Sequence, residues 1–112
     1  MIIPVAVDDK TITNSENQLF RNFPNPFRNN TEISFSLNEN ITDAKLTIYN
    51  IKGQKVRVLE CFNSFETKAT ESLSHITWNG KDENGSPVAA GIYFYQLQTD
   101  DFSAMKKMIL LR

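Results

Sequence analysis

The sequence predicts an all-β fold, an antiparallel β-sandwich of about seven strands. Short runs of alternating apolar and polar residues recur along the chain at roughly ten-residue spacing and are separated by turn residues. No window carries the sustained i, i+3, i+4, i+7 apolar pattern of an amphipathic helix. Eight Phe, three Tyr and one Trp among 112 residues add to the β tendency. A chain of this length can bury one two-layer core, so we expect a single domain.

Composition excludes several classes of partner. Twelve basic and thirteen acidic residues leave a net charge of −1, without the clustered basic face that nucleic-acid binding requires. No apolar run approaches the roughly 18–20 residues that cross a bilayer, so no membrane span is expected. The start of the chain lacks the charged region of a secretory signal peptide, so the protein is either cytoplasmic or a fragment whose signal lies elsewhere in a longer protein, and we favour the fragment. The single cysteine allows no internal disulfide.

Polar residues dominate the start of the chain. Residues 1–18 show little apolar periodicity and are predicted to be a linker or the end of a preceding region, so the folded domain is expected over residues 19–112. Shortly after that boundary, a Pro-Asn-Pro sequence rules out a helix and requires an extended or turning path. Phe23 and Phe27 bracket this turn, and both rings are expected to enter the core.

The middle of the chain contains strands predicted over residues 31–37, 44–50 and 54–60. Their inward-facing apolar residues are Ile33, Phe35, Leu37, Ala44, Leu46, Ile48, Val56 and Val58, with Leu59 under an edge. Gly53 stands where a hairpin between the second and third of these strands needs a positive φ. The polar segment 61–71 is expected to be a loop with an irregular strand, in which Phe62 and Phe65 cover one open end of the core.

The last part of the chain contains strands predicted over residues 72–78, 91–99 and 102–111. Trp78 and Leu97 lie on the apolar parity of their strands and are expected in the core. Between the first two of these strands, the polar segment 79–87 turns the chain. Residues 92–95 are apolar on both parities, as in a strand that is buried on both faces.

No residue pattern predicts an active site or a cofactor. Residues 82–85, Asp-Glu-Asn-Gly, resemble part of a calcium loop, but aligning the glycine with the sixth position puts Gly80 and Gly91 at both end ligand positions. A simple hairpin loop is therefore the favoured interpretation. The carboxylates that could form a catalytic pair, at 82, 83, 100 and 101, all stand in expected turns.

Three further residue types are better explained by structure than by chemistry. His75 lacks a second ligand at metal spacing and is expected to face solvent. Cys61 lacks a nearby base and is expected to be a buried or half-buried structural thiol. Tyr93 and Tyr95 suggest a sugar-stacking surface, but consecutive aromatics on a strand point to both sides, one of which is the core, so a core role is favoured.

Four segments together resemble one protein family. They are residues 19–27 (Leu-Phe-Arg-Asn-Phe-Pro-Asn-Pro-Phe), residues 46–59, residues 78–95 and the ending Lys-Met-Ile-Leu-Leu-Arg at 107–112. In this order they resemble the C-terminal sorting domain of the bacterial type IX (Por) secretion system, and residues 78–95 also resemble the immunoglobulin-like domain of flagellar hook-capping proteins. The residues that carry the resemblance are Pro24, Asn25, Pro26, Phe27, Gly53, Val56, Leu59, Trp78, Gly91, Tyr93 and Lys107. Where the family usually has Asp before the first loop glycine, this chain has Asn79.

The resemblance implies a non-catalytic, immunoglobulin-like β-sandwich at the end of a larger exported protein, often a peptidase or other hydrolase. It implies that the cargo reaches the periplasm by a signal peptide and then passes the outer-membrane translocon. A sortase commonly removes such domains while attaching the cargo to the cell surface. The implied partners are the type IX secretion machinery and its sortase, and the implied location is outside the cell or on the outer-membrane surface. We expect a monomer or weak dimer.

The sorting information is expected in the C-terminal strand, at Lys106, Lys107, Met108, Ile109, Leu110, Leu111 and Arg112. Met108 and Leu110 share one parity and Ile109 and Leu111 the other, so one pair can anchor in the core while the second presents an apolar strip beside the positive charges. Recognition would combine strand addition with side-chain pockets. The alternative is an accessory immunoglobulin-like binding module for polysaccharide or a neighbouring domain.

Overall fold

The computed structural model describes residues 17–38, 41, 43–61, 67–70 and 73–112. These residues form eight strands and no helix. The strands are β1 (Gln18–Phe23), β2 (Thr31–Ser36), β3 (Lys45–Asn50), β4 (Lys55–Glu60), β5 (Thr67–Thr70), β6 (Leu73–Trp78), β7 (Gly91–Gln98) and β8 (Ser103–Leu110). Strand β5 lies in the segment where an irregular strand was predicted, and β1, in the stretch predicted to be extended or turning, is the additional strand.

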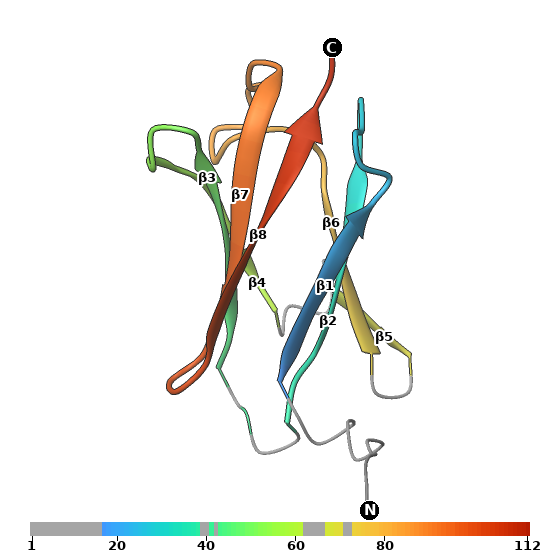
Figure 1. The fold of residues 1–112 in the computed structure, drawn as a ribbon, viewed down its shortest axis with the longest axis vertical. Helices are drawn as coiled ribbons and strands as arrows, with labels where there is room; N and C mark the ends of the chain where they lie inside the picture. The colour runs from blue at the N-terminus through green and yellow to red at the C-terminus, as the bar shows by residue number, and fades with distance from the viewer. Residues whose placement is uncertain (1–16, 39–40, 42, 62–66, 71–72) are drawn as a thin grey trace, which may run out of the picture.

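The strands make two antiparallel sheets that pack face to face as an immunoglobulin-like sandwich (Figure 1). One sheet has the order β1-β2-β6-β5 and the other β4-β3-β7-β8. The predicted fold class is confirmed. Within the described part of the chain, no helix has the length and apolar character needed to span a membrane.

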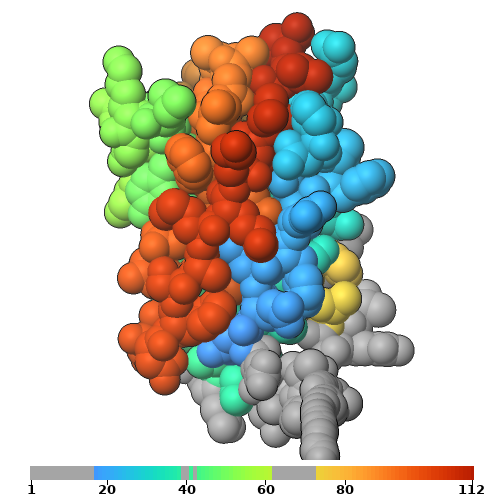
Figure 2. All heavy atoms as spheres, in the orientation of Figure 1, coloured from blue at the N-terminus to red at the C-terminus, as the bar shows by residue number. Residues whose placement is uncertain are grey.

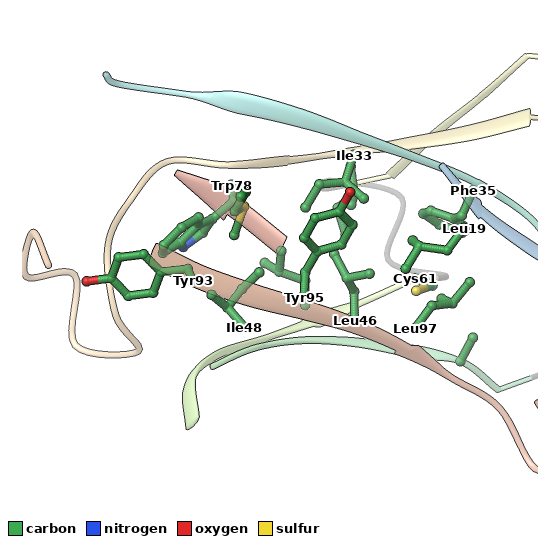
Figure 3. Close-up of a cluster of buried hydrophobic side chains, with 14 of the residues drawn as sticks. Leu19, Ile33, Phe35, Leu46, Ile48, Cys61, Trp78, Tyr93, Tyr95 and Leu97 are labelled. Carbon is green, nitrogen blue, oxygen red and sulfur yellow. The ribbon is translucent and has the colours of Figure 1, made fainter. Parts of the chain in front are cut away.

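The core lies between the sheets, where side chains from both layers meet (Figure 3). The predicted core residues Trp78, Phe35, Leu46, Ile48 and Leu97 are buried. Tyr93 and Tyr95 are also buried, which confirms their core role over a sugar-stacking one. Period-two alternation along each strand accounts for this placement, because alternate side chains of a strand point to the same face.

Val56, also predicted in the core, is only half-buried and packs against the edge of the core cluster. The register between β3 and β4 shifts at this point: Ile48 pairs with Arg57, but the next residue, Tyr49, pairs with Lys55. Val56 therefore has no partner on β3 and lies in a bulge, which re-aims its side chain. Leu59, beyond the bulge, is buried.

Phe23 is 77% exposed, so the expectation that its ring enters the core is wrong, whereas Phe27 is buried as predicted. The register of β1 against β2 shifts between Leu19 and Asn22, which places Asn22 inward. The Asn22 amide donates from Nδ2 to Thr31 Oγ1 at 2.9 Å. A buried polar side chain with a hydrogen-bond partner thus takes the inward position next to Phe23.

The β3–β4 hairpin has the predicted turn. Gly53 has φ +82°, and its N–H donates to Asn50 O at 2.9 Å. Asn50 Oδ1 accepts from the N–H groups of Lys52 and Gln54. The turn is therefore closed by both the backbone and the side chain of Asn50.

The first described strand starts one residue before the predicted domain boundary. Strand β1 starts at Gln18, and Asn17 Oδ1 accepts a hydrogen bond of 2.7 Å from the N–H of Asn38. The expected linker over residues 1–16, and the expected cover by Phe62 and Phe65, lie outside the described residues.

Candidate recognition surface at the C-terminal strand

Strand β8 is an edge strand of the second sheet and pairs with β7 along its whole length, from Ser103 opposite Gln98 to Leu110 opposite Gly91. Near its end, Met108 and Leu110 are buried, whereas Ile109 is half-buried and Leu111 is 37% exposed. The predicted division between an anchoring pair and an outward pair is confirmed. Lys106 and Lys107 are exposed, and within the described residues neither takes part in an ion pair.

The backbone at the end of β8 is occupied by the loop after β1. The N–H of Phe27 donates to Ile109 O at 3.0 Å, and the N–H of Leu111 donates to Phe27 O at 2.7 Å. The N–H of Ile109 donates to Asn25 Oδ1 at 3.0 Å. Strand addition along this part of the edge, which the sequence suggested, is therefore wrong, because its donors and acceptors are already used.

Arg112 holds the same segment on its other side. Its Nη2 donates to Gly80 O at 3.0 Å and to Val88 O at 2.9 Å, and its Nε donates to Val88 O at 3.1 Å. Arg112 was expected to present a charge beside the apolar strip, but its guanidinium is bonded to the loop between β6 and β7. A planar guanidinium with several donors suits two neighbouring carbonyls.

An aromatic cluster lies beneath this segment. The ring of Trp78 contacts Phe27 edge-on with centroids 5.8 Å apart, and Tyr93 with centroids 5.5 Å apart. Trp78 Nε1 donates to Lys81 O at 2.9 Å, and the Tyr93 hydroxyl donates to Ala89 O at 2.6 Å. Such contacts stabilise both the rings and the loop that carries the carbonyls.

Motif residues that are distant in the sequence thus meet in space. Asn25, Phe27, Trp78 and Tyr93 surround the end of β8, whereas Gly53, Val56 and Leu59 belong to the β3–β4 hairpin and its bulge. Pro24 contributes its carbonyl, which accepts from Thr31 Oγ1 at 2.8 Å. The contact between Asn25 and Ile109 was not foreseen, since no sequence period links residues 84 positions apart.

Gly91, one of the residues that carry the family resemblance, is not explained by a close approach of another part of the chain. A Cβ at this position would meet no atom within 4 Å. Its φ of +151° explains the glycine instead, because L side chains rarely adopt it.

The carboxylates of the β6–β7 loop are engaged within the fold. Asp82 Oδ1 accepts from the N–H groups of Asn84 and Ser86. Glu83 Oε2 accepts from the N–H of Val58 at 2.6 Å, and its Oε1 lies 3.8 Å from Arg57 Nε. Gly85 has φ +80°. With the antiparallel bridge between Lys81 and Pro87, these contacts form a local hairpin turn, as the sequence favoured, although the strands on either side, β6 and β7, lie in different sheets.

His75 is half-buried, so the expectation of a solvent-facing histidine is wrong. Its Nδ1 lies 2.9 Å from Ser34 Oγ and 3.9 Å from Glu32 Oε1, across the β2–β6 pair. Because both partners approach the same ring nitrogen, the three residues cannot relay a proton from serine through histidine to the carboxylate.

Cys61 is buried, as predicted. Burial, followed by the nearby Glu60 and Asp43 carboxylates, raises the pKa of its thiol to about 12. The thiol is therefore protonated at neutral pH and is a poor nucleophile. Its role is structural.

Comparisons with known proteins point to one family. The family model described as "Secretion system C-terminal sorting domain" matches residues 21–111. No protein of curated function matches the chain in sequence at a significant level.

Similar solved structures include two proteins from Porphyromonas gingivalis. PorZ, described as an essential surface component of the type IX secretion system, superposes with a TM-score of 0.58 at 18% identity, over 84% of this chain and 11% of PorZ. Dimeric latent PorU has a TM-score of 0.64 at 23% identity, over 83% of this chain and 9% of PorU. The chitinase ChiW from Paenibacillus sp. str. FPU-7 has a TM-score of 0.60 at 14% identity, over 83% and 8% of the two chains. At these identities the likeness shows the fold alone, and the chain spans about a tenth of each of these proteins.

Proposed function

The chain belongs to the family of secretion system C-terminal sorting domains, and from this premise we propose that it directs an attached cargo protein through the type IX outer-membrane translocon for release or surface attachment. The domain itself is of a generally non-catalytic kind, and its family marks proteins exported to the cell surface or the medium. The partners in this proposal are the translocon and the sortase that processes the cargo.

The observation that carries the proposal is the fixed presentation of the residues after Lys106. Their backbone is held by Asn25, Phe27 and the carbonyls that bind Arg112, while the side chains of Lys107, Ile109 and Leu111 point outward. A rigid strip of this kind can be recognised through its side chains without the entropy cost of ordering a flexible tail. We propose that the machinery reads this strip together with the two lysines.

The test is export of a reporter fused to the N-terminal side of the domain. Lys106→Gln combined with Lys107→Gln should leave the fold within about 0.5 kcal/mol per surface site, yet trap the reporter in the periplasm. Lys52→Gln combined with Lys55→Gln is the matched control, because these lysines are equally exposed but lie on the β3–β4 hairpin. Arg112 is tested separately, since its replacement also removes three hydrogen bonds.

Two outcomes would contradict different parts of the proposal. Normal surface delivery of the folded double lysine variant means that these charges are not read. Normal delivery of a reporter that lacks the whole domain means that the domain is not the sorting signal.

An accessory binding module is the second candidate, favoured by a hollow of about 260 Å³ on the outer face of the second sheet. Its lining includes Tyr49 and Phe94, which are half-buried and could stack on sugar rings. Retention of the domain on insoluble polysaccharide, lost in Tyr49→Ala, would support this function. An equal retention of both proteins would count against it.

A further inference from the structure

The free edge of β8 has two unlike halves. Ile109 turns its N–H and C=O away from β7, toward Asn25 and Phe27. In an antiparallel ladder these groups point alternately toward and away from the partner strand, so those of Lys107 and Met105 also point away from β7. Among the described residues, nothing bonds to the outward backbone groups of Lys107 and Met105.

This half of the edge is open to solvent. Met105 is 51% exposed, and Lys106 and Lys107 are both exposed. Figure 2 shows the red spheres of β8 uncovered on the face turned to the viewer, with β1 in blue beside them. An uncovered edge with unpaired donors and acceptors is a template for a further strand.

The charges on this edge decide which strand it admits. Lysines on an edge discourage pairing with a second copy, because that copy would bring its own lysines to the same place. Lys107 lies on the outer face of the sheet, and Lys106 has the opposite parity. An incoming strand would therefore meet a positive charge on each of its faces, which acidic side chains at two consecutive positions would match.

On the incoming strand, the position opposite Met105 favours an apolar side chain. Met105 forms part of the wall of the 260 Å³ hollow, together with Tyr49, Ile51 and Phe94. An added residue opposite Met105 on the outer face would lie beside this wall and could bury its side chain against it.

We propose that the edge of β8 from Met105 to Lys107 binds an extended acidic segment of a partner protein, which joins the sheet as an additional strand and carries an apolar residue next to two consecutive acidic ones. This inference rests on the proposed sorting function, because the partner protein would be encountered during export. It differs from side-chain reading of residues 107–112, because here the backbone of β8 supplies the binding groups.

The probe is a capped peptide of about ten residues, the length of a long strand, with alternating Val and Thr around a central Val-Glu-Glu-Val, which presents the same order in either strand direction. The comparison peptide carries Val-Lys-Lys-Val instead. We expect the acidic peptide at saturation to slow hydrogen exchange of the Met105 and Lys107 amides, and the basic peptide to leave both unchanged. Protection of residues that line the hollow, Met105 included, without protection of Lys107 would mean side-chain binding and would overturn strand addition.

Met105→Pro removes one outward donor and spares the ladder to β7, because the Met105 N–H does not point to β7. Met105→Ala keeps the donor and is its control. We expect the proline variant to bind the acidic peptide roughly threefold to tenfold more weakly than the alanine variant, the loss of one hydrogen bond. Equal binding by the two variants would overturn the proposal.

Charge reversal gives a second test that does not depend on proline being accommodated. Lys106→Glu combined with Lys107→Glu should reverse the preference, so that the basic peptide binds and the acidic one does not. If the reversed variant keeps its preference, or the edge pairs two copies of this chain in a sedimentation experiment, the proposal is wrong.

The reporter assay separates this inference from the sorting function. If deletion of the domain blocks export but Met105→Pro and Met105→Ala are exported alike, the sorting function stands and the edge is not used in export. If deletion has no effect, the sorting function fails, while the peptide measurements still decide whether the edge binds acidic strands.

Discussion

Trp78 links the core to the loop that holds Arg112. It is fully buried, contacts two aromatic rings and donates one hydrogen bond to Lys81 O. Trp78→Ala would leave a large cavity and should cost about 3–5 kcal/mol, comparable with much of a small domain's stability. Urea unfolding measures this loss, and Leu73→Ala on the partly exposed start of β6 is the control. An unchanged urea midpoint for Trp78→Ala would show that Trp78 does not stabilise the core.

At Gly53, backbone conformation alone determines which residues are tolerated. Its φ is +82°, and a Cβ would meet nothing within 4 Å. We therefore expect Gly53→Val to destabilise by about 1–2 kcal/mol through strain, and Gly53→Asn to be milder, because Asn tolerates this conformation. Thermal unfolding of the two variants is the measurement. Equal effects would show that the strain does not depend on the side chain.

Tyr95 makes stability sensitive to alkaline pH. Burial raises the pKa of its hydroxyl to about 12, and the hydroxyl donates to Phe20 O at 2.9 Å. The unfolded chain releases this proton near pH 10, so the contribution to stability is complete below about pH 10 and is lost as pH rises toward 12. The raised pKa of the Cys61 thiol acts in the same direction.

Tyr95→Phe should lower stability near neutral pH by about 1 kcal/mol, the worth of one hydrogen bond, and should flatten its decline above pH 10. Urea midpoints measured across this range, with Cys61→Ala in both proteins, isolate the tyrosine. A decline as steep in Tyr95→Phe as in the parent would assign the alkaline sensitivity to other groups.

Among the elements, the end of β8 depends on contacts from outside its own sheet. Asn25→Ala removes the acceptor for the Ile109 N–H and should speed hydrogen exchange of that amide by roughly threefold to tenfold, the equivalent of one hydrogen bond. The Leu111 amide, bonded to Phe27 O, should change less. Asn30→Ala in the same loop is the control. Unchanged exchange at Ile109 would mean that Asn25 does not hold the segment in solution.

Within the strands, the alternation of apolar and polar residues predicts burial up to a register shift. The pattern of β2 placed Ile33 and Phe35 inward, and both are buried. The same reasoning failed at Phe23 and held only in part at Val56, each beside a register shift. A bulge adds a residue to one strand only, so it reverses the parity of the residues beyond it without any mark in the apolar pattern.

For the whole molecule, we propose that the independent folding unit begins at Asn17, two residues before the predicted boundary. A chain that starts at Asn17 should match the full chain in its urea midpoint. A chain that starts at Leu19 loses the bond from Asn38 N–H to Asn17 Oδ1 and the pairing of Gln18 with Ser36, and should be less stable by about 1–3 kcal/mol. Equal stability of the two truncated chains would place the boundary after Gln18.

The β-sandwich, most of its core and the Gly53 turn could be predicted from the sequence alone, because each depends on local physics. Alternation with period two, the absence of a helical period and the conformational freedom of glycine act over a few residues. The resemblance to sorting domains likewise rested on short motifs in order. The same locality explains the prediction that one of the two apolar pairs of the last strand faces inward, whereas the structure identifies this pair as Met108 and Leu110.

Which groups of the C-terminal strand are bonded or covered depends on residues far away in the chain. Asn25 binds Ile109, Arg112 binds the carbonyls of Gly80 and Val88, and Phe27 covers one half of an edge whose other half stays open. Hydrogen bonds between such distant residues depend on how the two sheets and their loops are placed, and no local pattern records them. For this reason the sequence indicated the strand as a candidate signal, whereas the packing of the loops around it determines which of its groups a partner can reach.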